Sequence, residues 1–192
     1  NHKFSNKHYI HPMIGLHASF TLSEFSLKKI RDTLNSLDSW GIHIHVSEDI
    51  ADEEDAINRG YKSVVERLDK FDLINENSLL IHGIHMKNSD LELINTKDAQ
   101  LVHNPSSNAN NRVGLTPNQN LTILKSGIGT DGMQGNMLRE VKEGMLIRSS
   151  HLQGGMDSID YMKLLFENNP RIASNLFGYK LGKILSGYQA DM

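Results

Sequence analysis

Five short apolar runs, separated by longer segments with helical spacing of apolar residues, constrain the fold of this chain most strongly. The runs are predicted as strands at residues 14–19, 42–47, 78–84, 100–103 and 127–130. They recur at intervals of very roughly 30 residues, which is typical of β–α units. A chain built from such units folds into an α/β structure with a parallel sheet.

Apolar residues at helical spacing predict the helices between these runs. After Ser23, which is a plausible cap, Leu27, Ile30 and Leu34 share one face of a helix. A second helix is predicted over residues 52–71, and a third follows Asn136. Two more helical pieces are predicted near residues 158–167 and 170–176, interrupted by an Asn-Asn-Pro sequence.

Two segments have no clear helical period. Residues 104–120 are rich in Ser, Asn and Pro, and are predicted as a long polar loop. A long loop after a strand of an α/β fold carries function more often than not. The last segment, residues 179–192, is predicted as a short strand, a Ser-Gly turn and the start of another strand.

Composition excludes several classes of protein. The 192 residues carry a net charge of −3, which argues against a nucleic-acid-binding face. Without cysteine, the chain has no disulfides, no cysteine nucleophile and no thiolate ligands for zinc. No apolar run approaches the ~18 residues of a membrane span. The polar residues 1–9 do not resemble a secretory signal, so we expect a cytoplasmic protein with no membrane partner.

Polar side chains with metal-binding chemistry follow the predicted strands. Histidine lies at or near the end of four of them, as His17, His45, His82 and His103, and Asp131 follows the fifth. Each histidine alone is equally well explained as a core or loop residue. Ligands of parallel α/β folds gather beyond the carboxyl ends of the strands, so the set as a whole favours a site there.

The types of side chain indicate which metal such a site would hold. Glu48 stands three residues after His45, just beyond a strand end, and His43 shares a strand face with His45. Imidazole and carboxylate ligands without thiolate favour zinc, with iron as the alternative. Two simpler interpretations remain open: Glu48 could support the start of the next helix, and Asp131 could form an Asx turn.

The order of these motifs resembles the amidohydrolase superfamily. GLHASF, HVSE, IHGIH, HNPSSN and GTDG follow one another, and LGKILSGYQADM closes the chain. The resemblance is strongest to the branch with guanine deaminase, adenosylhomocysteine and thioadenosine deaminases, and triazine chlorohydrolases. The aminohydrolases linked to selenium metabolism are also similar. The resemblance to this superfamily implies a hydrolase in which metal-activated water displaces an amine or halide from a purine, pyrimidine or triazine.

The resemblance also implies roles for single residues. His45 and Asp131 would be metal ligands, and Asp131 would also take a proton from the water. Glu48 would be the general acid and base, and His82 would lie beside the water. One divalent metal is implied as the cofactor.

Three further residues would contact or surround the substrate: His17, His103 and Asn104. The implied partners are a small heterocyclic substrate and further copies of the chain in a homo-oligomer.

The resemblance implies a (β/α)8 barrel of which this chain holds about strands four to eight, in residues 1–178. Residues 179–192 would begin a C-terminal β-sandwich segment. The family's His-x-His at the end of strand one has no counterpart here, so we expect a fragment that is inactive alone. Two alternatives remain: a complete five-stranded, flavodoxin-like doubly wound domain, and a non-catalytic remnant that acts as a binding module.

Overall fold

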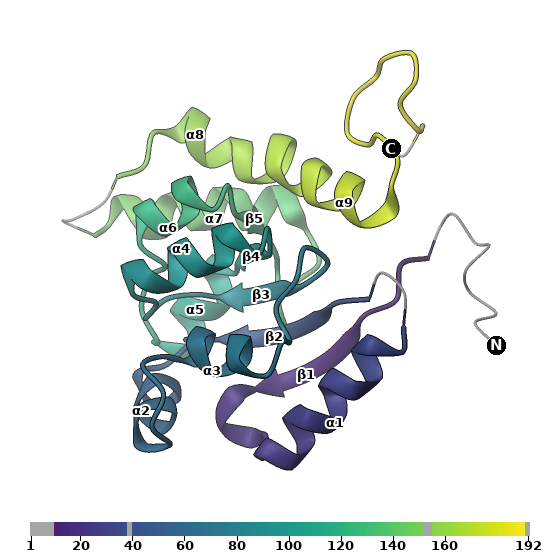
Figure 1. Cartoon of the computed structure of the whole chain (residues 1–192). Coiled ribbons are helices and arrows are strands. Elements are labelled where there is room, and N and C mark those ends of the chain that lie inside the picture. Colours follow the sequence, from purple (N-terminus) through teal and green to yellow (C-terminus); the bar gives the residue numbers. More distant parts are fainter. Residues whose placement is uncertain (1–9, 38–39, 152–154, 191–192) are drawn as a thin grey trace.

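The computed structural model describes residues 10–37, 40–151 and 155–190. The polar residues 1–9 and the last two residues of the predicted β-sandwich segment lie outside the described residues. The part of the chain that the structure describes is an α/β fold, with strands and helices alternating along the sequence as predicted (Figure 1).

All five predicted strands are present, and they form one sheet. The strands are β1 (Ile14–Ala18), β2 (Ile42–Val46), β3 (Leu79–His82), β4 (Gln100–His103) and β5 (Gly127–Ile128). All neighbours are parallel, and their order in space is β1-β2-β3-β4-β5, the order in sequence (Figure 1). A doubly wound sheet reverses its strand order part of the way across. The flavodoxin-like alternative is therefore wrong, and the sequential order is that of consecutive barrel strands.

Helices follow the strands and cover the sheet. They are α1 (Glu24–Asn35), α2 (Ile50–Asn58), α3 (Val64–Lys70), α4 (Asn88–Thr96), α5 (Pro105–Asn111), α6 (Asn118–Ile123), α7 (Met137–Ser149), α8 (Ser158–Lys163) and α9 (Asn169–Phe177), with a 3-10 turn η1 (Ser19–Thr21) and a π turn η2 (Leu164–Asn168). The helix starts predicted after Ser23 and Asn136 are confirmed. Ser23 Oγ accepts a hydrogen bond from Ser26 N, and Asn136 Oδ1 accepts one from Arg139 N.

The single helix predicted over residues 52–71 is wrong, because the segment forms α2 and α3. Gly60 has φ of +89°, a left-handed conformation that ends a helix. Ser63 then caps α3, since its Oγ accepts a hydrogen bond from Glu66 N at 3.0 Å. The helical period continues across the break because both helices pack on the same sheet, so periodicity alone did not show the interruption.

The long loop predicted for residues 104–120 is also wrong, since α5 and the start of α6 lie within it. Pro105 stands in the first helical turn of α5, where its missing N–H costs nothing. Ser and Asn have poor intrinsic helix propensity. Tertiary contacts of α5 outweigh this preference, as the Ser106 N–H, which donates to Glu140 Oε1 on α7, illustrates.

The predicted interruption at residues 168–170 does not occur. Helix α8 continues through the π turn η2 into α9. Pro170 has no backbone N–H to donate. The π turn directly before it, in which the Asn169 N–H donates to Leu164 O, accommodates the proline within the continuous helix.

The described part of the last segment, residues 179–190, forms turns and bends rather than the predicted strands. A strand needs a neighbouring strand for its backbone hydrogen bonds. The sheet of the described chain ends at β1 and β5, and this segment pairs with neither. The Gln189 N–H instead donates to Lys180 O within the segment, at 2.9 Å.

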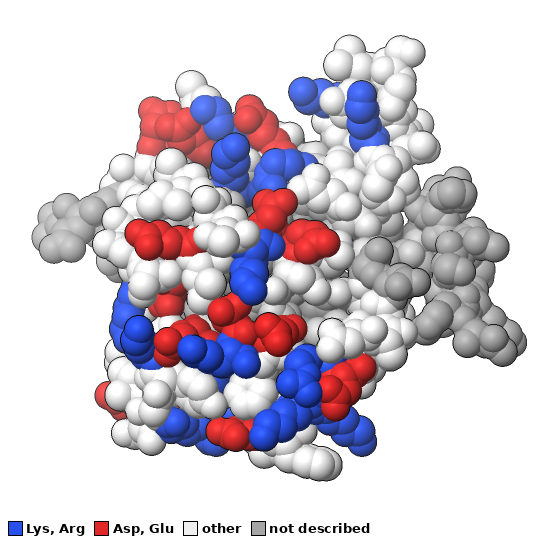
Figure 2. Space-filling view, in the orientation of Figure 1, with Lys and Arg blue, Asp and Glu red and all other residues white. Residues whose placement is uncertain are grey.

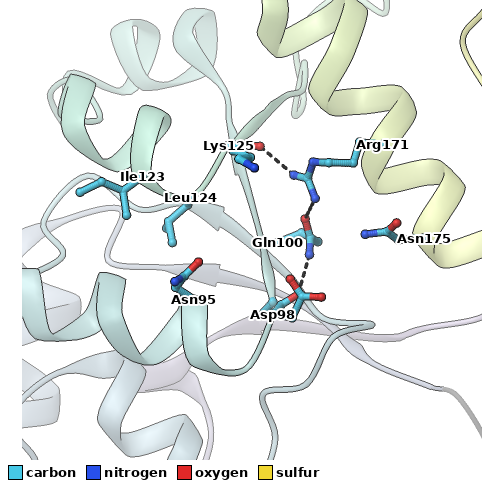
Figure 3. Close-up of a pocket in the computed structure, with 9 residues that line it drawn as sticks. Asn95, Asp98, Gln100, Ile123, Leu124, Lys125, Arg171 and Asn175 are labelled. Atoms are coloured by element: carbon cyan, nitrogen blue, oxygen red, sulfur yellow. Dashed lines mark hydrogen bonds between the residues drawn. The ribbon is translucent and has the colours of Figure 1, made fainter.

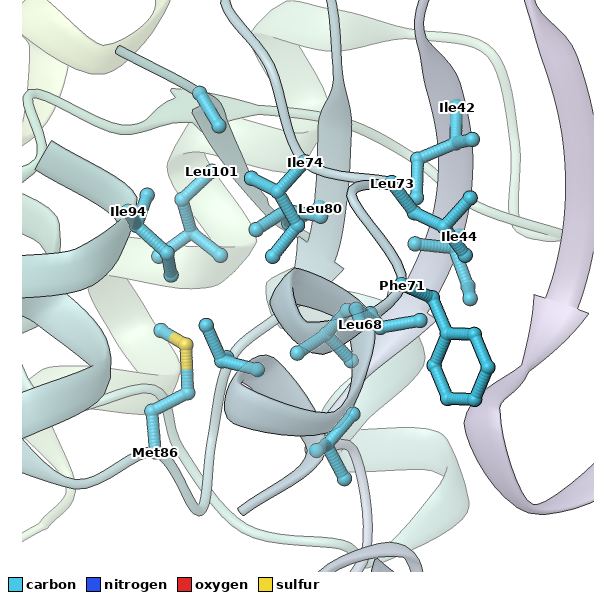
Figure 4. Close-up of a cluster of buried hydrophobic side chains, with 14 of the residues drawn as sticks. Ile42, Ile44, Leu68, Phe71, Leu73, Ile74, Leu80, Met86, Ile94 and Leu101 are labelled. Atoms are coloured by element: carbon cyan, nitrogen blue, oxygen red, sulfur yellow. The ribbon is translucent and has the colours of Figure 1, made fainter. Parts of the chain in front are cut away.

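The main core lies between the sheet and the helices of the first half of the chain. Ile44, Leu80 and Leu101 come from three neighbouring strands, and Leu68 and Ile94 pack on them from α3 and α4 (Figure 4). A smaller cluster gathers beneath α6, α7 and α8, and consists of Leu121, Ile128, Val141, Tyr161 and Leu164.

The two faces of β2 differ in their surroundings. Ile42, Ile44 and Val46 are fully buried in the core, whereas His43 is exposed and His45 is half-buried. His43 and His45 therefore share the face opposite the core, as predicted. None of the described helices is long and apolar enough to cross a membrane.

Replacing Ile44 tests the core. We expect Ile44→Ala to lower the free energy of unfolding by about 2–5 kcal/mol, because it removes a buried side chain and leaves a cavity. The matched control is Ile159→Ala, since Ile159 is 70% exposed and its loss should cost less than about 0.5 kcal/mol. Urea denaturation of the three proteins measures both changes, and equal losses would contradict the packing described.

Candidate active site

Three of the predicted site histidines lie next to one another at the carboxyl ends of β1, β2 and β3. The ring centroids of His17 and His45 are 5.4 Å apart, and those of His45 and His82 are 5.3 Å apart in a stacked arrangement. The parallel register places His45 opposite Ile81 and Val46 opposite His82. The pairing of β2 with β3 thus brings these two rings together.

The orientation of His45 is fixed by the backbone of the neighbouring strand. Its Nδ1 donates a hydrogen bond to the carbonyl oxygen of His17 at 2.7 Å. A carbonyl can only accept, so the proton is on Nδ1 and the lone pair is on Nε2. This is the arrangement usual in histidines that bind metals through Nε2.

His82 is fully buried and faces two carboxylates. Its Nδ1 donates to Asn108 Oδ1 at 2.7 Å. Its Nε2 lies 3.5 Å from Glu48 Oε2 and 3.9 Å from Asp131 Oδ2, and has no hydrogen-bond partner among the described residues. Burial lowers the pKa of His82, although the bond with Asn108 and the charge of Glu48 act in the opposite direction. The lone pair of a neutral ring therefore points toward two anionic groups, an arrangement that a donor or a cation between them would stabilise.

Asp131 is held as a carboxylate. Ser107 Oγ donates to Asp131 Oδ2 at 2.6 Å. Burial alone would raise the pKa of Asp131, but hydrogen bonds from the Ser107 hydroxyl and the Gly132 N–H act in the opposite direction, and the pKa lies below its ordinary value. Asp131 is consequently ionised at neutral pH and available as an anionic ligand or proton acceptor.

Glu48 follows a strained turn that buried carboxylates hold in place. Ser47 has φ of +51°, which is uncommon for a residue with a side chain. Its N–H donates to Asp52 Oδ2 at 2.9 Å, and its hydroxyl donates to Glu53 Oε1 at 2.6 Å. Burial raises the pKa of Asp52 to about 7 and also raises that of Glu53. Asn111 Nδ2 donates to Glu48 Oε1 at 3.2 Å from the other side.

Left-handed backbone conformations mark this end of the sheet. Ser47, His82 and Asp131 have φ of 51°, 77° and 51°, and each lies at or just after the end of a different strand. Such conformations cost free energy and persist where the surroundings enforce them, which is frequent at functional sites.

His103 and Asn104 lie deeper than the other site residues. His103 is fully buried: its Nδ1 donates to Thr116 Oγ1 at 2.9 Å, and Arg148 Nη2 donates to its Nε2 at 3.5 Å. Asn104, with its amide turned to satisfy both neighbours, donates to Gly129 O at 3.0 Å and to His103 O at 3.3 Å. In the described chain both side chains bind protein groups, so their predicted contact with substrate stays a prediction.

Sequence reasoning missed the residues that hold the site together. Ser47, Asp52 and Glu53 lie in the turn after β2 and in the first turn of α2. Ser107, Asn108 and Asn111 lie on α5, Thr116 lies between α5 and α6, and Arg148 lies on α7. Pro105 in the polar segment was a start signal for α5 that could have revealed the helix. Nothing in the sequence indicated the buried position of Arg148.

A pocket of about 310 Å³ lies away from these residues, beside Gln100 at the amino end of β4 (Figure 3). Arg171 crosses it and donates to Gln100 Oε1 at 2.9 Å and to Lys125 O at 2.8 Å. Because ligands of parallel α/β folds bind at the carboxyl ends of the strands, we assign this polar network to stability.

Charges of both signs are interspersed over the face shown in Figure 2, without a continuous basic region on it. The described residues contain no group of three or more His, Cys, Asp or Glu side chains arranged to hold a metal ion.

The chain belongs to the amidohydrolase family, whose sequence model matches residues 2–192. The predicted resemblance is therefore confirmed.

Among its relatives is 5'-deoxyadenosine deaminase of Methanopyrus kandleri, 30% identical over 93% of this chain and 42% of that protein. Another is 5-methylthioadenosine/S-adenosylhomocysteine deaminase of Thermococcus onnurineus, 30% identical over 95% of this chain and 44% of that protein. The chain thus spans less than half the length of these relatives.

Solved structures show the same fold. An adenosine deaminase from Xanthomonas campestris with bound zinc superposes with a TM-score of 0.84 and 22% identity, over 98% of this chain and 44% of that one. Escherichia coli guanine deaminase gives a TM-score of 0.81 and 18% identity, over 93% and 42% of the two chains. The fold is thus part of the barrel of this family, as predicted from the sequence.

The buried His103 makes stability depend on pH in a definite direction. Burial, and then the Arg148 guanidinium, hold the pKa of His103 well below its ordinary value of 6.5. Below pH 6.5 the unfolded chain binds a proton that the folded chain does not, so this residue lowers the free energy of unfolding as pH falls, by up to about 1.4 kcal/mol per pH unit.

We therefore expect the stability difference between wild type and His103→Gln to shrink as pH falls from 7.5 to 5.5. Urea midpoints across that range measure it. The exposed His151 provides the control, and His151→Gln is measured over the same range. A constant difference for His103→Gln would show that His103 takes up protons in the folded protein as it does in the unfolded chain, and would contradict the prediction.

Proposed function

We propose that the whole protein is a metal-dependent aminohydrolase that releases ammonia from a purine or related heterocycle. The observation that carries the proposal is the buried Nε2 of His82, which has no hydrogen-bond partner among the described residues and lies 3.5 Å from Glu48 Oε2 and 3.9 Å from Asp131 Oδ2. A proton-transfer site needs such groups within reach of one reacting atom.

The residues present agree in chemistry with a divalent metal, for which zinc is our first choice and iron the second. His45 keeps its Nε2 lone pair free, and Asp131 is held ionised by Ser107. We assign both as ligands. They are fewer than a complete metal site needs, and the family resemblance implies that the others come from a His-x-His sequence outside this chain.

The proposed reaction assigns separate tasks to the polar side chains. When bound, the metal supplies hydroxide chemistry near neutral pH, because it lowers the pKa of water from 15.7 to about 7. Asp131 accepts a proton from the attacking water. Asp131 then passes this proton to the leaving amine, which leaves poorly until protonated. Glu48 delivers a proton to the ring nitrogen and recovers one from the hydroxyl group added to the ring. His82 accepts a hydrogen bond at Nε2 and thereby orients the water.

Adenosine-type substrates are supported best, because the relatives at 30% identity are named as deaminases of 5'-deoxyadenosine, methylthioadenosine and adenosylhomocysteine. We place the exposed side chain of His17 in the substrate pocket, and the buried His103 and Asn104 in the wall behind it. Halide displacement is the second candidate, because an atrazine chlorohydrolase from Arthrobacter aurescens has the same fold, with a TM-score of 0.71 and 13% identity.

We further propose a cytoplasmic homo-oligomer that binds neither nucleic acid nor membranes. We keep residues 1–178 as the barrel part and 179–192 as the start of a β-sandwich.

A non-catalytic binding module is the competing proposal. The metal content of the whole protein distinguishes the aminohydrolase from the binding module.

Metal loading and ammonia release test the proposed function together. We expect the whole protein, prepared with zinc, to hold about one ion per chain and to release ammonia from 5'-deoxyadenosine or S-adenosylhomocysteine. His45→Ala should lose both properties. His151 is exposed and follows the end of α7, so His151→Ala should keep them. Absence of metal and of ammonia release from all of these adenosine compounds and guanine would favour the binding module.

Glu48 is expected to act in proton transfer rather than in metal binding. Glu48→Gln should lower kcat by about 10²–10⁴-fold because an amide cannot carry the proton, while zinc content stays unchanged. The control is Glu54→Gln, an exposed position of α2 that should leave kcat unaltered. Zinc loss in Glu48→Gln would instead assign Glu48 to the metal.

A further inference from the structure

We propose that helix α5 is the positioning element of this site, and that Ser107, Asn108 and Asn111 set the rate of the reaction through Asp131, His82 and Glu48. The inference rests on the proposed function for its kinetic part. The proposal also gives a role to α5, which lies within the polar residues 104–120.

The three contacts come from one face of one short helix. Ser107 Oγ donates to Asp131 at 2.6 Å, and Asn111 Nδ2 donates to Glu48 at 3.2 Å. Asn108 Oδ1 accepts from His82 at 2.7 Å. With 3.6 residues per turn, positions i, i+1 and i+4 of a helix fall within an arc of about 100°, so the three side chains leave the helix on one side. One helix therefore reaches all three groups, Asp131, His82 and Glu48, to which the proposed reaction assigns a role.

Each side chain on α5 has the chemistry that its partner needs. A carboxylate only accepts hydrogen bonds, and Ser107 and Asn111 supply donors to Asp131 and Glu48. The neutral ring of His82 needs an acceptor at Nδ1 if its Nε2 is to keep the lone pair, and the oxygen of Asn108 provides it. Asn108 is fully buried, so water cannot replace it.

The helix is held from behind by α7, which is why it can serve as a fixed support. The Ser106 N–H donates to Glu140 Oε1 at 2.9 Å, and its hydroxyl donates to Glu143 Oε2 at 2.8 Å. Ser106 and Ser107 are thus adjacent, of the same type and similarly buried, at 6% and 5% exposure. Only Ser107 contacts a group assigned to the reaction, so the pair forms a matched test and control.

The first experiment compares Ser107→Ala with Ser106→Ala in the whole protein loaded with zinc. We expect Ser107→Ala to lower kcat by about 10–100-fold with little change in KM, because Asp131 loses its orientation. Ser106→Ala removes the hydroxyl bond to Glu143 but keeps the backbone N–H bond to Glu140 that holds α5 on α7. It should therefore stay within about twofold of wild type in kcat, although it costs similar stability. Ser107→Thr keeps the hydroxyl and should restore most of the rate. Equal kcat values for the two alanine variants, matched for thermal stability, would overturn the proposal.

The second experiment observes His82 directly and needs no turnover. Histidine nitrogen NMR shifts report which ring nitrogen carries the proton. We expect wild type and Asn108→Asp to show the Nδ1–H form of His82, and Asn108→Leu to lose it. An unchanged His82 signal in Asn108→Leu would overturn the positioning role. If wild type releases no ammonia, the proposed function fails, and the NMR result alone decides the role of Asn108.

Discussion

The parallel pairing of β2 with β3 is the constraint on which the site depends. Its register puts Val46 opposite His82 and brings the rings of His45 and His82 into a stack with centroids 5.3 Å apart. The same pairing of the two strands places Ile44 and Leu80 side by side in the core on the other face of the sheet. A shift of register would therefore disturb the core and the histidines together, because side chains alternate between the two faces of a strand.

Much of this arrangement was predictable from local patterns. The five strands, the helix starts after Ser23 and Asn136, and the position of His17, His45, His82 and Asp131 at one end of the sheet follow from local patterns of apolar residues and from a general property of parallel sheets. The predictions failed where tertiary contacts outweigh local preference. Helix α5 forms in a sequence of poor helix formers because its polar side chains bond to strand ends and to α7.

The hydrogen-bond partners of the site residues could not be predicted, for a physical reason. Apolar periodicity is visible in a sequence because many residues along an element are buried against the same core. Asn108 and Arg148 each bind a partner that is distant in the sequence and lies near only in the folded chain. Arg148 lies on α7 and donates to His103 on β4, 45 residues earlier in the chain. No local pattern encodes a contact of this kind.

Neutral partners distinguish the site from an ordinary salt-bridge network. Asp131 and Glu48 receive hydrogen bonds from a hydroxyl and an amide, and His82 donates to an amide oxygen. An arginine or lysine at these positions would pair with the carboxylates and compete with a bound cation for them. These neutral donors orient the two carboxylates without placing a positive charge next to them. Since His82 also directs a lone pair toward the same place, the surrounding helix prepares a region that favours a positive ion or a proton.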